Sequence, residues 1–160
     1  AATEEERARG GTGLELARRA HCRYLRRNLW HLAEGFTALD ASRTWIVYWI
    51  THGLALLGDP LEGDDARKCV AFLARCQDAS GGFGGGPGQL PHLAPTYAAV
   101  SALLTLGGDE ALGTVDRKAL HAFLLRMKDP ETGGFRMHDD GEVDVRGCYT
   151  AVATAAMLDI

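Results

Sequence analysis

The chain repeats itself with a period of 52 residues, and this constrains its fold more than any other feature. The segment GGFGGGPGQLPHLAPTYAAVSALLTLG spans 81–107, and a weaker copy, GGFRMHDDGEVDVRGCYTAVATAAML, follows. Phe83 and Phe135 are 52 residues apart, as are Tyr97 and Tyr149. A fixed period of this size indicates a repeat architecture, in which each unit buries its apolar face against its neighbours.

An amphipathic helix is predicted before the GGF turn of each copy. Asp64 or Asp65 can cap the first of these helices, and Asp116 can cap the second. In both helices the apolar residues recur at i, i+3, i+4 and i+7, which places them on one stripe. These positions are Cys69, Phe72, Leu73 and Cys76 in the first helix, and Leu120, Phe123, Leu124 and Met127 in the second. We expect both to be half-buried outer helices.

The helix after each turn differs in kind. Segments 96–106 and 148–158 are apolar or small on every face, so we expect helices buried on all sides, with Pro95 in the first turn of the earlier one. A degraded third copy precedes them, with an inner helix at 44–58 and an outer helix at 14–32. The apolar stripe of that outer helix is Cys22, Leu25, Leu29 and Leu32.

The expected fold is therefore all-α, with inner and outer helices paired into hairpins that stack three times. Such a stack can curl into an α/α toroid, and three hairpins give an incomplete arc with an apolar helix edge exposed. We divide the chain into a flexible N-terminal segment, 1–13, and a partial toroid domain, 14–160. Since the chain ends in AAMLDI, inside a helical pattern, we expect it to be part of something longer.

Composition excludes several other classes. The 160 residues suffice for one domain, and the net charge of −4 gives no electrostatic case for a nucleic-acid partner. No apolar run approaches the length of a membrane span. The four cysteines form no CxxC pair, which favours free thiols in a reducing, cytoplasmic setting. The histidines show no ligand spacing such as HExxH, so we assign no metal to this chain.

Three segments resemble, in order and spacing, the β subunits of protein farnesyltransferases. They are LDASRTWIVYWI, GGFGGGPGQLPHLAPTYAAV and GEVDVRGCYTA, and the resemblance runs from about Leu16 to the last residue. It implies an α/α toroid of about six hairpins around a central cavity, and a heterodimer with a helical-repeat α subunit. It also implies transfer of a C15 farnesyl group from farnesyl diphosphate to the cysteine of a C-terminal CaaX signal.

The resemblance further implies two metals. Zinc holds the substrate thiol as a thiolate, and magnesium assists the departure of diphosphate. The zinc ligands of the family, and most of its diphosphate-binding positions, lie beyond Ile160. We therefore expect this chain to bind neither metal and to be inactive alone, while supplying walls of the isoprenoid and peptide pockets.

The site residues also follow from the resemblance. The isoprenoid-binding positions are Trp45, Tyr97, Arg146 and Tyr149, and the peptide-binding positions are Trp49, His92, Ala94, Glu142 and Arg146. Within the peptide site, His92, Glu142 and Arg146 match a water-bridged group near the substrate's C-terminal carboxylate. The bulky indole of Trp45 would shorten the cavity, whereas the related geranylgeranyl enzyme carries a small residue there.

Plainer explanations exist for several of these residues. His92 and Arg146 could be polar residues at helix starts, although a cation there opposes the helix dipole, so that Arg146 needs an outside reason. Glu142 and Asp144 could simply cap the last inner helix. The acidic segment 139–144 is one residue too long for the DDxxD magnesium motif, which favours an acidic loop, with His138 exposed beside it.

Two other motifs favour ordinary structure. GGFGGGPG is followed by no GK[ST] and preceded by no strand, which favours a turn and close packing over a phosphate loop. The basic residues of 18–27 favour a solvated helix face. At the level of function, the alternatives are the β subunit of a type I geranylgeranyltransferase, against which Trp45 argues, and a non-catalytic helical-repeat binding module.

Overall fold

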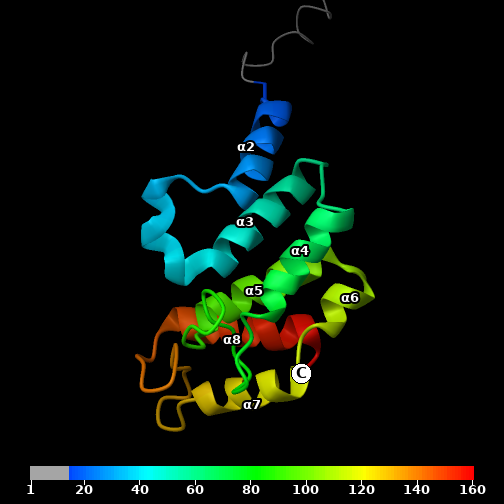
Figure 1. Ribbon diagram of the computed structural model, residues 1–160. Helices are drawn as coiled ribbons and strands as arrows, with labels where there is room; N and C mark the ends of the chain where they lie inside the picture. Colours follow the sequence, from blue (N-terminus) through cyan, green and yellow to red (C-terminus); the bar gives the residue numbers. More distant parts are fainter. Residues whose placement is uncertain (1–14) are drawn as a thin grey trace, which may run out of the picture.

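A computed structural model describes residues 15–160, and within that range the chain is helical with no strand. The expected flexible segment 1–13 lies outside the described residues. Figure 1 shows the order of the elements. They are α2 (Arg18–Trp30), the 3₁₀ helix η1 (Glu34–Ser42), α3 (Arg43–Leu56), α4 (Gly63–Ala74), α5 (Leu93–Leu106), α6 (Gly108–Gly113), α7 (Arg117–Met127) and α8 (Val145–Leu158).

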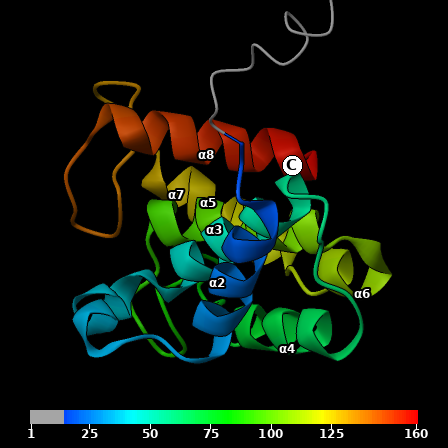
Figure 2. The same ribbon diagram turned by 90° about the horizontal axis from the view of Figure 1, so that it is seen from above.

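Three helix pairs form most of the described part of the molecule, and η1 and α6 connect them. Helices α3, α5 and α8 form the inner row, in which α5 lies between the other two (Figures 1 and 2). Each inner helix carries an outer partner: α2 packs on α3, α4 on α5, and α7 on α8. This arrangement confirms the predicted all-α stack of three hairpins. None of the described helices is both long and apolar enough to cross a membrane.

The core lies between the inner and outer rows. Leu73 of α4 and Phe123 of α7, which belong to the two amphipathic stripes, are completely buried, and they pack with the buried Leu54 of α3 and Leu103 of α5 in one core. A fully buried side chain of this size contributes about 1.5–3 kcal/mol to folding. One stripe position is wrong: Leu32 is exposed, because α2 already ends at Trp30 and the chain turns away from the core there.

The inner helices differ in how completely they are buried. α5 is buried along most of its length, as predicted. For segment 148–158 of α8 the same prediction is wrong, since Tyr149 and Val152 are 63% and 59% exposed. The physical reason is position, because α8 packs on α5 and α7 and no described element covers its remaining face. This face is the exposed apolar edge that the open arc predicts.

The GGF turn of the first copy allows a close approach of backbone to backbone. Gly81 has a φ of +108°, and a Cβ atom there would overlap the backbone carbonyl of Ala119 in α7. A Cβ atom on Gly82 would come within 2.7 Å of the Phe123 ring. The glycines therefore serve a turn and close packing, as predicted. In the second copy, Gly133 also has a positive φ, +73°, but open space surrounds it.

The helix caps follow the sequence in two of three cases. The Asp116 carboxylate accepts the Ala119 N–H at 2.9 Å and caps α7, and Asp144 caps α8 by accepting the Arg146 N–H at 2.7 Å. The predicted cap of α4 is wrong. That helix begins at Gly63, which puts Asp64 and Asp65 inside its first turn. There their negative charges interact favourably with the helix dipole instead of capping the helix.

We expect Asp116→Ala to lower the free energy of unfolding by about 1 kcal/mol, because it leaves an N–H at the start of α7 without its partner. Urea unfolding of the two proteins measures this difference. Asp65→Ala is the matched control, since Asp65 accepts no capping bond, and its effect should stay within a few tenths of a kcal/mol. Equal losses in the two variants would contradict the assignment of the caps.

Candidate functional site

A row of three aromatic rings crosses the inner helices. Trp45 of α3, Tyr97 of α5 and Tyr149 of α8 are each 52 residues apart, so they occupy the same place near the start of successive inner helices. The ring centroids of Trp45 and Tyr97 are 5.8 Å apart, and those of Tyr97 and Tyr149 are 5.5 Å apart. The two tyrosine hydroxyls lie within 3.4 Å of each other. The repeat thus builds one continuous aromatic surface.

This row borders a hollow with a volume of about 560 Å³, within the usual range for small-molecule sites. Its lining contains seven of the eight residues that the sequence predicts for the site. The lining residues are Trp45, His92, Ala94, Tyr97, Met137, Glu142, Val145, Arg146, Tyr149 and Thr150. We refer to it as the inner hollow.

One predicted site residue lies outside the lining. Trp49 is one turn further along α3, and its indole contacts that of Trp45, with ring centroids 5.6 Å apart. Three lining residues were missed by the sequence reasoning: Met137, Val145 and Thr150. Val145 and Thr150 fall inside the GEVDVRGCYTA segment, so that motif could have pointed to them. Met137 comes from the loop before α8, where no periodic pattern exists.

A second hollow of about 490 Å³ adjoins the first and shares Trp45, His92 and Ala94 with it. His138 also lines this second hollow, and its ring lies 5.4 Å from that of His92. The expectation that His138 is exposed is therefore wrong. It is half-buried, because the loop before α8 folds back against the start of α5. Trp45 and His92 thus line both the inner hollow and the second hollow.

His92 has a structural task in addition to its place in the hollow. It is the N-cap residue of α5, and its Nδ1 accepts the Ala94 N–H at 3.0 Å. Burial, together with the neighbouring His138, lowers the pKa of His92. The neutral ring therefore keeps its proton on Nε2, because Nδ1 is the acceptor. Nε2–H is the group that remains to donate to a ligand.

Arg146 forms ion pairs with two acidic residues of the same chain. Its Nε and one terminal nitrogen contact the Asp144 carboxylate at 2.7 and 3.0 Å, and Glu142 lies 3.8 Å away. The guanidinium holds the pKa of Asp144 below its usual range. Asp144 thus offsets the unfavourable interaction of Arg146 with the helix dipole, and the role of Arg146 in the pocket stays a prediction. The Arg146 side chain is still 69% exposed and can reach an anion in the hollow.

The described residues offer little to a metal ion. Within 15–160, no three or more His, Cys, Asp or Glu side chains gather in a way that could hold one. The thiols of Cys69 and Cys76 lie in the core, where burial raises the pKa of each to about 11. Both therefore stay protonated near neutral pH and act as small apolar side chains.

Comparison with known proteins gives the following similarities. The profile of the prenyltransferase alpha-alpha toroid domain matches residues 16–160. The protein farnesyltransferase β subunit of Arabidopsis thaliana is 53% identical over 147 residues, which cover 92% of this chain and 30% of the relative. That of Pisum sativum is 56% identical over 118 residues, 74% of this chain and 28% of the relative.

A fungal relative is similar to a lesser degree. The protein farnesyltransferase β subunit of Saccharomyces cerevisiae is 44% identical over 131 residues, which cover 81% of this chain and 30% of that protein. The chain thus spans about 30% of the length of the curated relatives it matches. The matched region contains the whole inner hollow.

Proposed function

Because the chain belongs to the prenyltransferase α/α toroid family, we propose that it is part of the β subunit of a protein farnesyltransferase. The enzyme would pair this subunit with an α subunit and transfer a C15 farnesyl group from farnesyl diphosphate to the cysteine of a C-terminal CaaX signal. The observation that carries the proposal is the inner hollow, in which seven residues matched to the family's pockets line one space.

The aromatic row suits the isoprenoid chain. Trp45, Tyr97 and Tyr149 would contact the farnesyl group, and the flexible C15 chain would lie against their faces. Burial of such a chain contributes on the order of 10 kcal/mol, at about 0.8 kcal/mol for each methylene. The indole of Trp45 would set the length that fits, which favours a C15 over a C20 group and argues against the geranylgeranyl alternative.

The polar end of the hollow suits the carboxylate of a CaaX peptide. Arg146 supplies an exposed cation, and His92 supplies the Nε2–H donor. Glu142 would act through a bridging water, since a direct contact between two carboxylates is repulsive. Ala94, which lines the hollow, would contact the peptide side chains. Trp49 would contact the peptide from its place beside Trp45, just outside the lining of the hollow.

The proposal leaves the metals outside the described residues. Zinc and magnesium belong to the chemistry that the family resemblance implies, and within residues 15–160 no three or more His, Cys, Asp or Glu side chains gather around a place for an ion. We therefore derive no step from a metal and assign these residues to binding and positioning. A cytoplasmic setting is part of the proposal, because all four cysteines are free thiols.

The proposal is tested with the complete β subunit that contains this chain, assembled with its α subunit. The assay follows transfer of farnesyl from farnesyl diphosphate to a fluorescent CaaX peptide, and the same peptide with serine in place of cysteine is the control. We expect transfer to the cysteine peptide only. Failure of the assembled heterodimer to modify that peptide would contradict the proposed function.

We expect Arg146→Ala to raise the KM for the CaaX peptide by about tenfold and to leave kcat nearly unchanged. The substitution removes a cation that acts on the bound peptide and not on the reacting bond. Arg67→Ala is the matched control, because Arg67 is similarly exposed and lies outside the hollow. A fall in kcat together with a loss of metal from the heterodimer would mean that the substitution had damaged the fold instead.

A further inference from the structure

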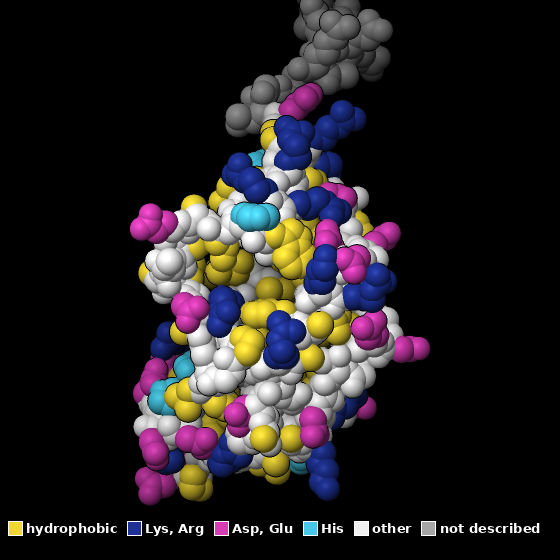
Figure 3. Space-filling model, viewed as in Figure 1, with side chains coloured by type: hydrophobic (Ala, Val, Ile, Leu, Met, Phe, Trp, Pro, Cys, Tyr) yellow, Lys and Arg dark blue, Asp and Glu magenta, His cyan; other side chains and the backbone are white. Residues whose placement is uncertain are grey.

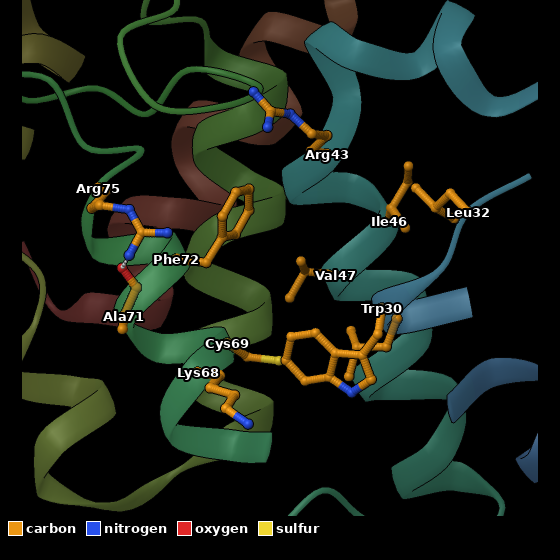
Figure 4. A pocket seen from close by; sticks show the side chains of 11 residues that line it. Trp30, Leu32, Arg43, Ile46, Val47, Lys68, Cys69, Ala71, Phe72 and Arg75 are labelled. Atoms are coloured by element: carbon orange, nitrogen blue, oxygen red, sulfur yellow. Dashed lines mark hydrogen bonds between the residues drawn. The ribbon is translucent and has the colours of Figure 1, made fainter. Parts of the chain in front are cut away.

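A separate groove lies between the outer helices α2 and α4, against another face of α3. It has a volume of about 400 Å³ and shares no lining residue with the inner hollow. Figure 4 looks into it: Ile46 and Val47 come from α3, Trp30 from the end of α2, and Cys69 and Phe72 from α4. We call this space the outer groove.

Large apolar side chains are open to solvent at this groove. Trp30 is 45% exposed, and Leu32, which the sequence pattern placed in the core, is 40% exposed and also lines the groove. Figure 3 shows the face as a hollowed patch of hydrophobic side chains with charged side chains of both signs around it. An exposed apolar patch with a polar border is typical of a surface on which another molecule docks.

The charged side chains of the outer groove all have one sign. Of the described residues that line it, three are cationic, namely Arg43, Lys68 and Arg75, and none is acidic. Aromatic rings hold these cations at the edge: the Lys68 ammonium lies 5.7 Å from the centre of the Trp30 ring, and both guanidinium groups lie over Phe72. Lys68 pairs with Asp64 and Arg43 with Asp40, and solvent screens both of these exposed pairs. Arg75 donates to the backbone carbonyl of Ala71 at 2.9 Å.

The spacing of the cations indicates the shape of the occupant. Lys68 lies on α4 and Arg75 is the C-cap residue of that helix, seven residues later, which is two turns, or about 10 Å along the helix axis. Positive charge is therefore spread along the wall of the groove. A single phosphate or carboxylate headgroup would need the cations gathered at one end. A helix that lies along α4 presents its own side chains at the same seven-residue spacing.

We infer that the outer groove binds an amphipathic α-helix of a partner protein. Its apolar ridge would lie on Ile46, Val47 and Phe72, and acidic side chains spaced seven residues apart beside the ridge would face Lys68 and Arg75. The chain's own residues 1–14 fit less well. They contain three glutamates but a single large apolar residue, Leu14, so they would supply the charge without the ridge.

The test uses the whole 160-residue chain and a synthetic helix of about 18 residues, with a leucine ridge and glutamates flanking it at i and i+7. Fluorescence anisotropy gives the affinity, and the control peptide has lysine in place of each glutamate. We expect the glutamate peptide to bind at least about tenfold more tightly than the lysine peptide. In the double variant Lys68→Glu, Arg75→Glu, the preference should reverse.

A second pair of variants tests the place of binding. Ala71 lines the groove and is exposed, so Ala71→Trp should fill the space without disturbing the core, and should weaken binding at least about tenfold. Ala122 of α7 occupies the same repeat position 51 residues later, is also exposed and lies outside the groove, and Ala122→Trp should leave affinity unchanged. Thermal unfolding of both variants confirms that they fold.

Four outcomes would overturn the inference. The first is equal binding of the two peptides, and the second is an equal effect of Ala71→Trp and Ala122→Trp. The third is self-association of the chain in sedimentation runs that Ala71→Trp abolishes, which would make a second copy the occupant. The fourth is binding to phosphatidylserine vesicles that Ala71→Trp abolishes, without binding of the glutamate peptide.

Discussion

Trp45→Thr in the complete heterodimer should move the preference between C15 and C20 diphosphates toward the C20 substrate by about 100-fold. The Trp45 indole lies against Tyr97 and fills the side of the inner hollow that the isoprenoid would reach. Five further carbons add about 4 kcal/mol if they are fully buried, which sets a ceiling of about 1,000-fold. Incomplete burial brings the expected change down to about 100-fold. The measurement is the ratio of kcat/KM values with both diphosphates in competition.

Trp49→Thr is the matched control for this result. Trp49 carries the same side chain on the same helix, one turn further on, and does not line the inner hollow. Its replacement should keep the preference for the C15 diphosphate within a few fold, even if the affinity for the peptide changes. An unchanged preference in Trp45→Thr, or an equal change in both variants, would remove Trp45 as the residue that sets chain length.

The largest expected effect on stability is that of Gly81→Ala. We expect it to lower the free energy of unfolding by about 3 kcal/mol or more and the melting temperature by roughly 10 °C. Two costs add together: Gly81 has a φ of +108°, which alanine adopts only under strain, and the new Cβ atom overlaps the backbone of Ala119. Relief of that overlap requires α7 to move away from the turn. Calorimetry and urea unfolding measure the loss.

The second copy of the repeat provides a control for this substitution. Gly133 occupies the same place in its own GGF turn and has a φ of +73°, but a Cβ atom there meets no other atom within 4 Å. Gly133→Ala should therefore carry the backbone cost alone, about 1–2 kcal/mol. If the two alanine variants lost the same stability, the contact between Gly81 and α7 would not be what requires glycine in the first copy.

The 52-residue period explains why so much of the fold could be predicted. Apolar stripes at helical spacing located each outer helix, and apolar segments without a polar face located each inner one. The errors fall at ends and edges. Asp64 and Asp65 look like caps, but α4 begins before them. Leu32 continues a stripe in sequence, but the helix that would carry it stops at Trp30. Where a helix stops depends on tertiary contacts that periodicity does not report.

In the candidate site, too, the residues set by the repeat could be predicted and those set by tertiary contacts could not. Residues at equal places in successive copies, such as Trp45, Tyr97 and Tyr149, must lie on one face of the inner row, so their meeting was predictable. Met137 and the half-buried ring of His138 come from a loop whose path depends on the hydrogen bonds it makes with the start of α5. The outer groove depends on the distance between α2 and α4, which belong to different copies, and no pattern within one copy encodes that distance.

Each copy of the repeat contributes one ring to the aromatic row, and this limits the sequence changes that keep the row intact. The ring centroids are 5.5–5.8 Å apart because neighbouring inner helices pack against each other. Duplication of a whole copy would add one ring to the row at the same spacing. An insertion of one residue within an inner helix, ahead of its ring, would instead rotate that ring by about 100° around the helix axis, out of the row. Divergence among such proteins should therefore proceed by exchange of single rings or of entire copies.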